Sequence, residues 1–288
     1  MNYNALIHNR KSVREFTDKA VDQTEIDKIR TFYNKSIHRL FPELKTELLV
    51  FGTGARDVLE GAAGYNQFLV GAPQYLVLLS EDGDMMEENA GFMMEDLILK
   101  LEDLNLAGCW LTFTDSDLVK QALAIDSPLK VVAMAAFGHG AKAVRRLRLN
   151  FRSMSNVDIV AKHRYMEPKR SVFDMVYLHH WGNSKKVKDY IGFFDDMLWE
   201  SLYAASLAPS YLNRQAYGFV IHEGGISLVS RPDEYTTEID GRLSMGIALL
   251  HFTAVAEGWT GKLNWRFGAD VAGLEVPEDH KVIATVAL

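Results

Sequence analysis

The sequence predicts an α+β protein made of two diverged copies of one unit, fused in a single chain of 288 residues. In both halves, segments with helical spacing of apolar residues alternate with short apolar runs of strand length. Three anchors of the first half also recur in the second half at almost constant spacing. With 48% hydrophobic and 24% charged residues, the composition allows each copy a buried core.

The repeat is defined by glycines at long helices and by a lysine that opens a strand. The spacing between paired anchors drifts slowly, as small loop deletions would produce, and chance similarity of apolar segments is the alternative. The anchor pairs are Gly91 and Gly246, Gly108 and Gly261, and Lys130 and Lys281. We therefore predict a pseudo-dimer with a first copy over residues 1–165 and a second over 166–288, joined near the polar, proline-containing segment 164–170.

In the first half, helices are predicted where apolar residues recur every three or four positions, and strands where apolar runs meet turn residues. Thr24 is the expected N-cap of the first helix, Pro73 opens a strand, and Gly138 ends the last strand. The predicted helices cover residues 24–38, 55–63, 86–104 and 115–123, and the predicted strands cover 48–51, 75–79 and 130–137.

The second half repeats this pattern with fewer recognisable elements. A helix over 190–207 stops before Pro209, because the residue before a proline is disfavoured in helical conformation. A second helix over 243–257 is closed by a glycine. Strands are predicted over 219–222 and 281–287.

Charge and cysteine content limit the possible partners and compartment. A net charge of −7 disfavours nucleic acid or an anionic membrane as the main partner. The single cysteine, Cys109, cannot form an internal disulfide, and its apolar neighbours favour an inert buried thiol over a reactive one. No apolar run approaches the roughly 20 residues of a membrane-spanning helix, and the N-terminus has no signal-peptide core. We therefore expect a cytoplasmic protein.

Metal and nucleophilic catalysis lack sequence support. His179 and His180 are adjacent and would point about 100° apart on a helix, and the apolar flanks of His251 favour a core histidine over a ligand. The sequence contains no His-Glu-x-x-His, Gly-x-Ser-x-Gly or phosphate-loop motif. The chemistry must therefore come from other polar clusters.

Three polar clusters suit an aromatic ligand that carries a phosphate. In the first, Arg10 to Phe16, alternation places Arg10, Ser12 and Arg14 on one side of an extended segment, with Lys11 between them, where they could converge on a phosphate. A solvated basic stretch is the alternative. The second cluster, residues 145–148, includes Arg146 and Arg148, and an ordinary charged surface is its alternative.

The third cluster is a loop that begins where the predicted helix 190–207 ends. Its hydroxyl and carboxamide groups could hydrogen-bond the rim of a heteroaromatic ring without adding charge, and a plain helix-to-strand connection is the alternative. The candidate residues of this loop are Pro209, Ser210, Asn213 and Gln215.

The Arg-x-Ser-x-Arg-x-Phe start and the Ala-Pro-Ser-x-x-Asn-x-Gln loop at 208–215 resemble the FMN-dependent nitroreductases. The resemblance implies a nitroreductase-like α/β sandwich, in which one copy binds the FMN phosphate and the other supplies the loop against the flavin ring. Here the phosphate-binding clusters lie in the first copy and the loop lies in the second, which implies one complete flavin site and one lost site. Asn66 lies near the position at which an asparagine of the family approaches the flavin.

The resemblance also implies a function, which is hydride transfer from NAD(P)H through FMN to a nitroaromatic, quinone or similar acceptor. The family loop usually continues Gln-Pro-Trp, whereas this chain has Gln215-Ala216-Tyr217, and the loss of the proline makes the loop less rigid. A non-catalytic flavin carrier or sensor, and a flavin-free structural protein, are the alternatives. Since the fusion supplies the family's dimer interface, a monomer is the simplest expectation.

Overall fold

The computed structural model describes residues 1–65, 68–141, 146–153, 156–162, 169–184, 196–268 and 274–287, with the backbone alone for 146–153 and 156–162. Its helices are α1 (Tyr3–Asn9), α2 (Gln23–Lys35), α3 (Ala55–Leu59), α4 (Met86–Asp103), α5 (Ser116–Ala122), α7 (Asp196–Ser206) and α8 (Glu238–Thr260). Its strands are β1 (Thr46–Phe51), β2 (Gln74–Ser80), β3 (Ala107–Leu111), β4 (Lys130–Gly138), β5 (Arg146–Ser153), β6 (Asn156–Lys162), β7 (Val176–Leu178), β8 (Tyr217–His222), β9 (Gly225–Ser230), β10 (Arg266–Phe267) and β11 (Lys281–Val286).

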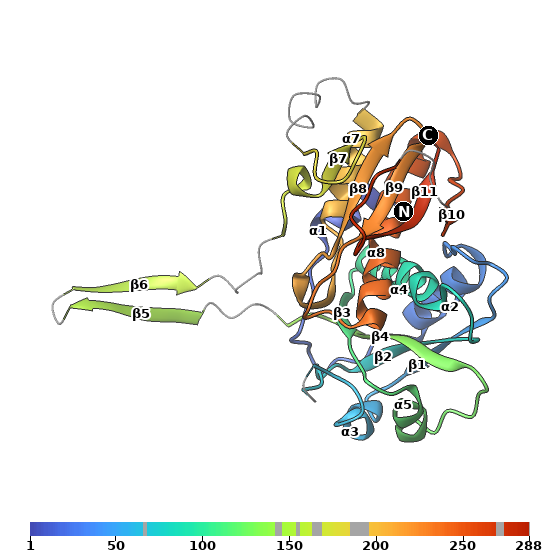
Figure 1. Ribbon diagram of the computed structural model, residues 1–288. Helices are drawn as coiled ribbons and strands as arrows, with labels where there is room; N and C mark the ends of the chain where they lie inside the picture. The colour runs from blue at the N-terminus through green and yellow to red at the C-terminus, as the bar shows by residue number, and fades with distance from the viewer. Residues whose placement is uncertain are drawn as a thin grey trace.

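Two sheets of the same topology form the body of the molecule (Figure 1). The first sheet has the antiparallel order β1-β2-β4-β3, and four strands of the second have the antiparallel order β8-β9-β11-β10. The second sheet also gains β7, which pairs in parallel with β8. The fold is therefore the predicted α+β sandwich of two tandem copies, and β7 has no counterpart in the first sheet.

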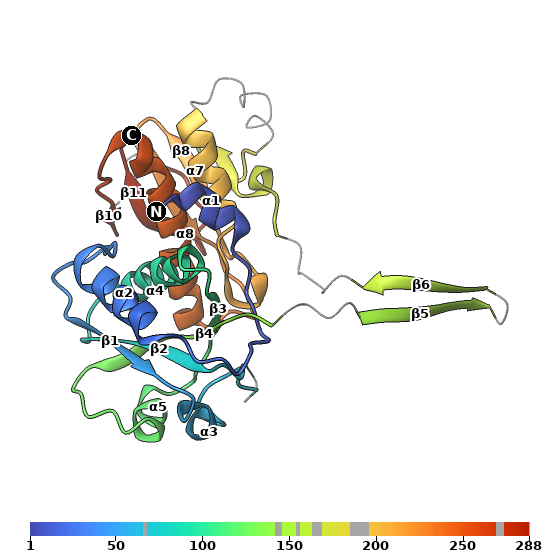
Figure 2. The ribbon, with the colours of Figure 1, turned by 180° about the vertical axis from the view of Figure 1, so that it is seen from behind.

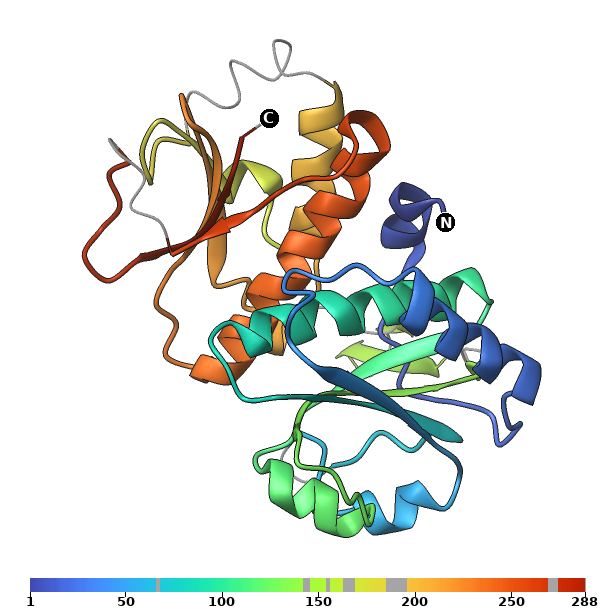
Figure 3. The ribbon, with the colours of Figure 1, turned by 90° about the vertical axis from the view of Figure 1, so that its right-hand side faces the viewer.

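The two copies meet at the crossing of α4 and α8, which lie against each other at the centre of the molecule (Figure 3). A Cβ atom at Gly91 would lie 2.2 Å from the carbonyl oxygen of Leu243, and one at Gly246 would lie 2.0 Å from that of Glu88. Each contacted residue stands three positions before the partner glycine, so the contact is the same in both directions. Reciprocity of this kind is the property of a two-fold interface. This crossing therefore makes the chain a pseudo-dimer.

The sheet register corrects one of the anchors of the repeat. Gly108 lies inside β3, opposite Phe137, whereas Gly261 is the C-cap of α8 with a φ of 82°. The two glycines are therefore not equivalent. Trp110 pairs with Ala135 in the first sheet. In the second sheet Arg266 pairs with Thr285, and this register places the preceding residue, Trp265, at the position that corresponds to Trp110.

Strand β2 shows why the first sheet is buried on both faces. Leu76 and Leu78 pack in the core beneath α2 and α4, while Tyr75, Val77 and Leu79 pack on the opposite side with α3 and α5. All five side chains are fully buried. Since successive strand residues point to opposite faces, the continuous apolar run of β2 requires a helical layer on each side, as Figure 3 shows.

The predicted elements are present with shifted ends. Helix α2 begins at Gln23 because Asp22 and Glu25 form a capping box, so the expectation of Thr24 as N-cap was wrong. Helix α8 starts at Glu238, five residues before the predicted start, with Thr237 as its N-cap. The sequence did not predict α1, β3, β5, β6, β7, β9 or β10, of which β7 and β10 are too short for a periodic signal. The first residues of the predicted helix 190–207 lie outside the described residues.

Strands β5 and β6 form an antiparallel hairpin that belongs to neither main sheet. Both Figure 1 and Figure 2 show it standing away from the body. In the part of the chain that the structure describes, no helix is long and apolar enough to cross a membrane.

Candidate functional site

The N-terminal segment runs along strand β3 in extended conformation. Ser12 forms a parallel bridge with Gly108, and the Val13 N–H donates to the Gly108 carbonyl over 3.1 Å. An Nη1–H of Arg10 points at the Ser12 hydroxyl oxygen at 3.4 Å. The alternation of the segment thus brings Arg10 and Ser12 together, while the neighbouring Lys11 and Arg14 are exposed.

Glu95, on α4, collects three partners beneath this segment. Its carboxylate is fully buried, lies 3.2 Å from Nε of Arg10 and accepts a 2.6 Å hydrogen bond from Nε1 of Trp110. Nε2 of His251, from α8, is 3.0 Å away. Burial raises the pKa of Glu95, but Arg10, His251 and Trp110 outweigh it and lower the pKa overall. Glu95 is therefore an ion that holds Arg10 in place and joins both copies.

His251 lies between two acceptors from different elements. Nδ1 lies 3.0 Å from the carbonyl oxygen of Ala204, and Nε2 faces the Glu95 carboxylate. The ring therefore links α8 to both α7 and α4. His251 is a core histidine, as the sequence indicated, but it also supports the site.

Lys169 adds a second cation beside Arg10. Its Nζ donates a 2.5 Å hydrogen bond to the carbonyl oxygen of Ala208, at the start of the third polar cluster. Burial, together with the charge of Arg10, lowers the pKa of Lys169 to about 7. A nearby anion would raise the pKa of Lys169 again, so the two basic side chains, Arg10 and Lys169, fit a phosphate group. In the sequence, Lys169 lies in the segment 164–170 that is predicted to join the two copies, and with Arg170 it forms a basic pair after the last strands of the first copy.

The 209–215 loop has an unusual backbone. Leu212, Asn213 and Gln215 have φ values of 46°, 55° and 45°, in a region that non-glycine residues rarely adopt. The Gln215 N–H donates to the Ser210 hydroxyl over 2.9 Å, which closes the loop on itself. Strained backbone of this kind is typical of functional sites, because the surrounding structure must hold it.

The side chain of Gln215 anchors the loop to neighbouring segments by hydrogen bonds. Its side chain is fully buried, with Nε2 donating to the Ser206 carbonyl over 2.7 Å and Oε1 accepting from the Arg170 N–H over 2.8 Å. Both ends of the carboxamide are thus engaged within the protein. Gln215 holds the loop against segment 169–170, and a direct contact with a flavin stays a prediction.

The first copy has an equivalent loop after α2. The Leu40 N–H donates to Oδ1 of Asn89 over 3.0 Å, just as the Tyr211 N–H donates to the Ser244 hydroxyl over 3.3 Å. Asn89 and Ser244 stand two residues before Gly91 and Gly246, so the two contacts are related by the pseudo-two-fold axis. The two copies therefore place two equivalent loops on opposite sides of the α4–α8 crossing.

Aromatic and charged contacts occupy the equivalent loop in the first copy. Phe41 packs on Phe267 with a centroid distance of 4.7 Å. His38 lies 2.9 Å from Asp96 and 3.4 Å from Glu257 through its two ring nitrogens. Burial lowers the pKa of His38, but the hydrogen bonds to Asp96 and Glu257 outweigh it and raise the pKa to about 10. This loop is therefore bound to both long helices.

The charge of His38 predicts that the protein loses stability at alkaline pH. Because the folded pKa of about 10 exceeds the unfolded value of 6.5, the stabilisation is complete below pH 6.5 and disappears as pH rises towards 10. We expect a loss of up to about 5 kcal/mol from this group, measured by urea unfolding across that range. The His38→Gln variant should lack this part of the pH dependence. An unchanged profile in the variant would contradict the assignment.

An exposed aromatic rim borders the 209–215 loop. The ring centroids of Tyr65 and Tyr211, from different copies, are 6.2 Å apart. Tyr65, Phe68 and Leu212 are exposed, and Tyr211 is half-buried. Asn66 lies outside the described residues, and the side chains of Arg146 and Arg148 on β5 are not described, so their assignments to the flavin site stay predictions.

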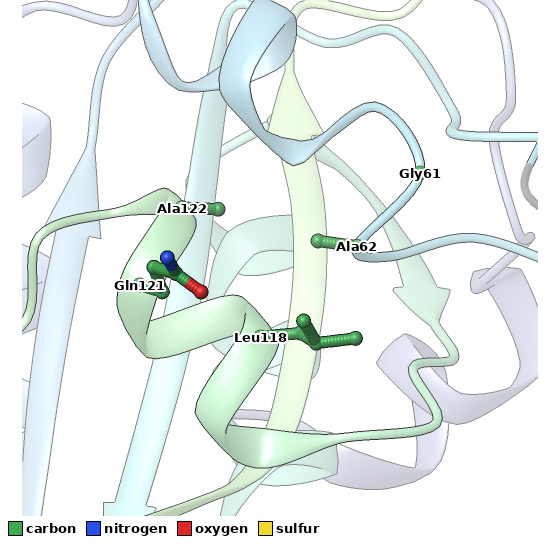
Figure 4. A pocket seen from close by; sticks show the side chains of 5 residues that line it. All are labelled: Gly61, Ala62, Leu118, Gln121 and Ala122. Carbon is green, nitrogen blue, oxygen red and sulfur yellow. The ribbon is translucent and has the colours of Figure 1, made fainter.

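The two best-defined pockets lie elsewhere. One of about 250 Å³ is lined by residues of the turn after α3 and of α5, as Figure 4 shows, and one of about 610 Å³ lies beside α1 and the end of α8. Neither is lined by any predicted flavin-binding residue. Within the described ranges, no group of three or more His, Cys, Asp or Glu residues could hold a metal ion.

Comparison with known proteins identifies the family. Residues 2–256 match the family model described as "Putative TM nitroreductase". The chain belongs to this nitroreductase family. No curated protein matches it.

One solved nitroreductase structure has a similar fold over the whole chain. A putative nitroreductase from Thermotoga maritima, 18% identical, covers 100% of this chain over 94% of its own length with a TM-score of 0.58. An FMN-dependent nitroreductase from Clostridium difficile, 19% identical, covers 48% of this chain over 88% of its own length with a TM-score of 0.43. The first of these extends over both copies of this nitroreductase-family chain.

Proposed function

We propose that this nitroreductase-family protein binds one FMN between its two copies and acts as an NAD(P)H-dependent oxidoreductase. The electron acceptor is a nitroaromatic, a quinone or a similar compound. The observation that carries this proposal is the meeting of Arg10 and Ser12 with Lys169 and the 209–215 loop. These groups come from both copies and combine two cations with a strained polar loop.

The charge of these residues, and the fact that they come from both copies, fit a flavin that carries a phosphate. Arg10, Ser12 and Lys169 would hold the phosphate, with the exposed Lys11 and Arg14 beside them. The loop residues Pro209, Ser210 and Asn213 would lie against the ring, and Gln215 would keep them in place. Arg146, Arg148 and Asn66 are further candidates.

The chain itself supplies position and electrostatics. FMN, when bound, supplies the hydride transfer between nicotinamide and acceptor. Glu95 keeps the Arg10 guanidinium in place, and the exposed Tyr65 and the half-buried Tyr211 offer flat apolar surfaces at which an aromatic acceptor could stack. No protein nucleophile is needed. In the proposed division of the chain into two copies, the phosphate site lies in the first copy (1–165), and Lys169 joins it from the start of the second copy.

The deciding experiment is the visible spectrum of purified protein before and after anaerobic addition of NADH or NADPH. The proposal expects about one flavin per chain and bleaching by one of the nicotinamides. A flavin that neither nicotinamide bleaches would favour the carrier or sensor. A colourless protein that does not take up added FMN would contradict the proposed function.

Lys169 makes FMN affinity dependent on pH. The pKa of Lys169 is about 7 in the free protein, and a phosphate beside it would raise that value. Binding then takes up a proton above pH 7, so we expect affinity to fall by up to about tenfold per pH unit as pH rises above 7. Fluorescence titration with FMN measures this directly. The Lys169→Arg variant keeps its charge and should bind without that fall, whereas a flat wild-type profile would exclude Lys169 from the site.

A further inference from the structure

A cavity of about 610 Å³ lies where α1 meets α7 and the end of α8 (Figure 2), and it is called the α1 cavity below. His38, from the segment after α2, also lines it, so its walls come from both copies. A cavity of this volume suits a small organic molecule. None of the predicted flavin-binding residues lines it, so any ligand here would occupy a site of its own.

The polar side chains of the α1 cavity are held in place by the protein. Nδ2 of Asn4 donates to Oε2 of Glu200 over 2.9 Å. The Leu263 N–H donates to Oε1 of Glu257 over 2.8 Å, and Nε2 of His38 lies 3.4 Å from Oε2 of the same carboxylate. Because these groups are positioned before a ligand arrives, binding loses less conformational entropy.

The charged side chains of the cavity leave an acceptor free. The Tyr3 hydroxyl donates to Asp96 over 2.9 Å. Both ring nitrogens of His38 face carboxylates, those of Asp96 and Glu257. Oε1 of Glu200, by contrast, has no hydrogen-bond partner among the described residues. A carboxylate only accepts hydrogen bonds, so a ligand at this position must donate one.

The charge balance of the cavity favours a cation. Glu200 and Glu257 line it, and the buried carboxylate of Asp96 lies behind them against His38. His38, with its pKa raised to about 10, supplies one positive charge, and the amino group of Met1, which also lines the cavity, supplies another. Three negative charges against two positive ones leave the cavity negative. An ammonium group therefore fits both the charge and the free acceptor.

One wall of the cavity is apolar. Ala254 and Val255 of α8 are buried, whereas Trp259, one turn further along the helix, is 60% exposed. An indole in this position can be covered by the apolar part of a ligand, and its ring face attracts a cation. The wall therefore favours an amine that carries an apolar group over a small inorganic cation.

We propose that the α1 cavity binds a small organic amine, with its ammonium group at Glu200 and its apolar group against Trp259. The proposal goes beyond the proposed function and does not depend on it, because the α1 cavity shares no residue with the flavin site.

Isothermal titration calorimetry of the purified protein with 2-phenylethylamine tests the proposal. We expect saturable binding of one amine per chain, at least about tenfold tighter than that of 2-phenylethanol, which has a similar shape without the charge. Glu200→Gln keeps the acceptor for Asn4 but loses the charge, and it should weaken binding by about tenfold. The control Glu60→Gln changes an exposed carboxylate at the end of α3 and should bind like wild type.

A second variant guards against misfolding of the first. Trp259 is exposed, so Trp259→Ala should leave the unfolding midpoint unchanged and weaken amine binding by roughly fivefold. The proposal is overturned if the amine and the alcohol bind equally, or if Glu200→Gln binds like wild type. Absence of amine binding would overturn it as well, and this is the result expected if the Met1 amino group fills the cavity.

A titration with added FMN separates this site from the flavin site. Amine affinity should be the same with and without FMN, and competition between the two would place the amine in the flavin site and overturn the proposal. If the protein takes up no FMN, only the proposed function fails, because the first titration still tests the α1 cavity.

Discussion

Replacing Arg10 by Met should weaken FMN binding by about a hundredfold, which corresponds to the loss of one charge-assisted contact of roughly 3 kcal/mol. The same change should destabilise the protein by about 3–5 kcal/mol, because it leaves the buried carboxylate of Glu95 without its guanidinium partner. Fluorescence titration with FMN and urea unfolding of the flavin-free protein measure the two effects separately.

The double variant Arg10→Met/Glu95→Gln separates the two roles of Arg10. Neutralising Glu95 removes the uncompensated buried charge, so stability should recover relative to the single variant, while FMN affinity should stay low. If affinity recovered together with stability, Arg10 would act on the fold alone and the phosphate site would have to lie elsewhere.

Replacing Gly246 by Ala should be among the most destabilising single substitutions in this protein, at about 3–5 kcal/mol. The added Cβ would lie 2.0 Å from the carbonyl oxygen of Glu88, a backbone atom that no rotamer change can move. Helices α4 and α8 would have to separate, and the interface between the copies would open. Thermal and urea unfolding report the loss, and Gly91→Ala should behave alike.

Gly258 provides a matched control in the same helix. A Cβ there would meet nothing within 4 Å, so Gly258→Ala should stabilise α8 by about 0.5–1 kcal/mol through helix propensity alone. Equal effects at the two glycines would contradict the close approach of the helices at the pseudo-two-fold axis.

Features that depend on a local pattern could be predicted from the amino-acid sequence. The apolar periodicity of α4 and the continuous apolar run of β2 identified those elements within one or two residues. The repeat around Gly91 and Gly246 predicted the duplication, because the same helix contact constrains both sequences in the same way. The family resemblance was also readable, since the 208–215 loop is a continuous segment.

Which distant residues act together is evident only in the folded chain. Lys169 stood in a segment that looked like a linker, and folding places it beside Arg10, more than 150 residues earlier in the chain. The network of Glu95 with His251 and Trp110 likewise joins α4, α8 and β3. Such contacts leave no periodic signal, because a single buried charge is balanced by partners from any part of the chain.

The hairpin shows the same division. Its alternating residues were readable in the sequence, yet at that level they belonged to a basic surface cluster. Only the structure shows that β5 pairs with β6 alone and that this hairpin belongs to neither main sheet. Local patterns determine which face of an element is apolar, whereas what covers that face depends on where the chain places the element, and this is a property of the whole fold.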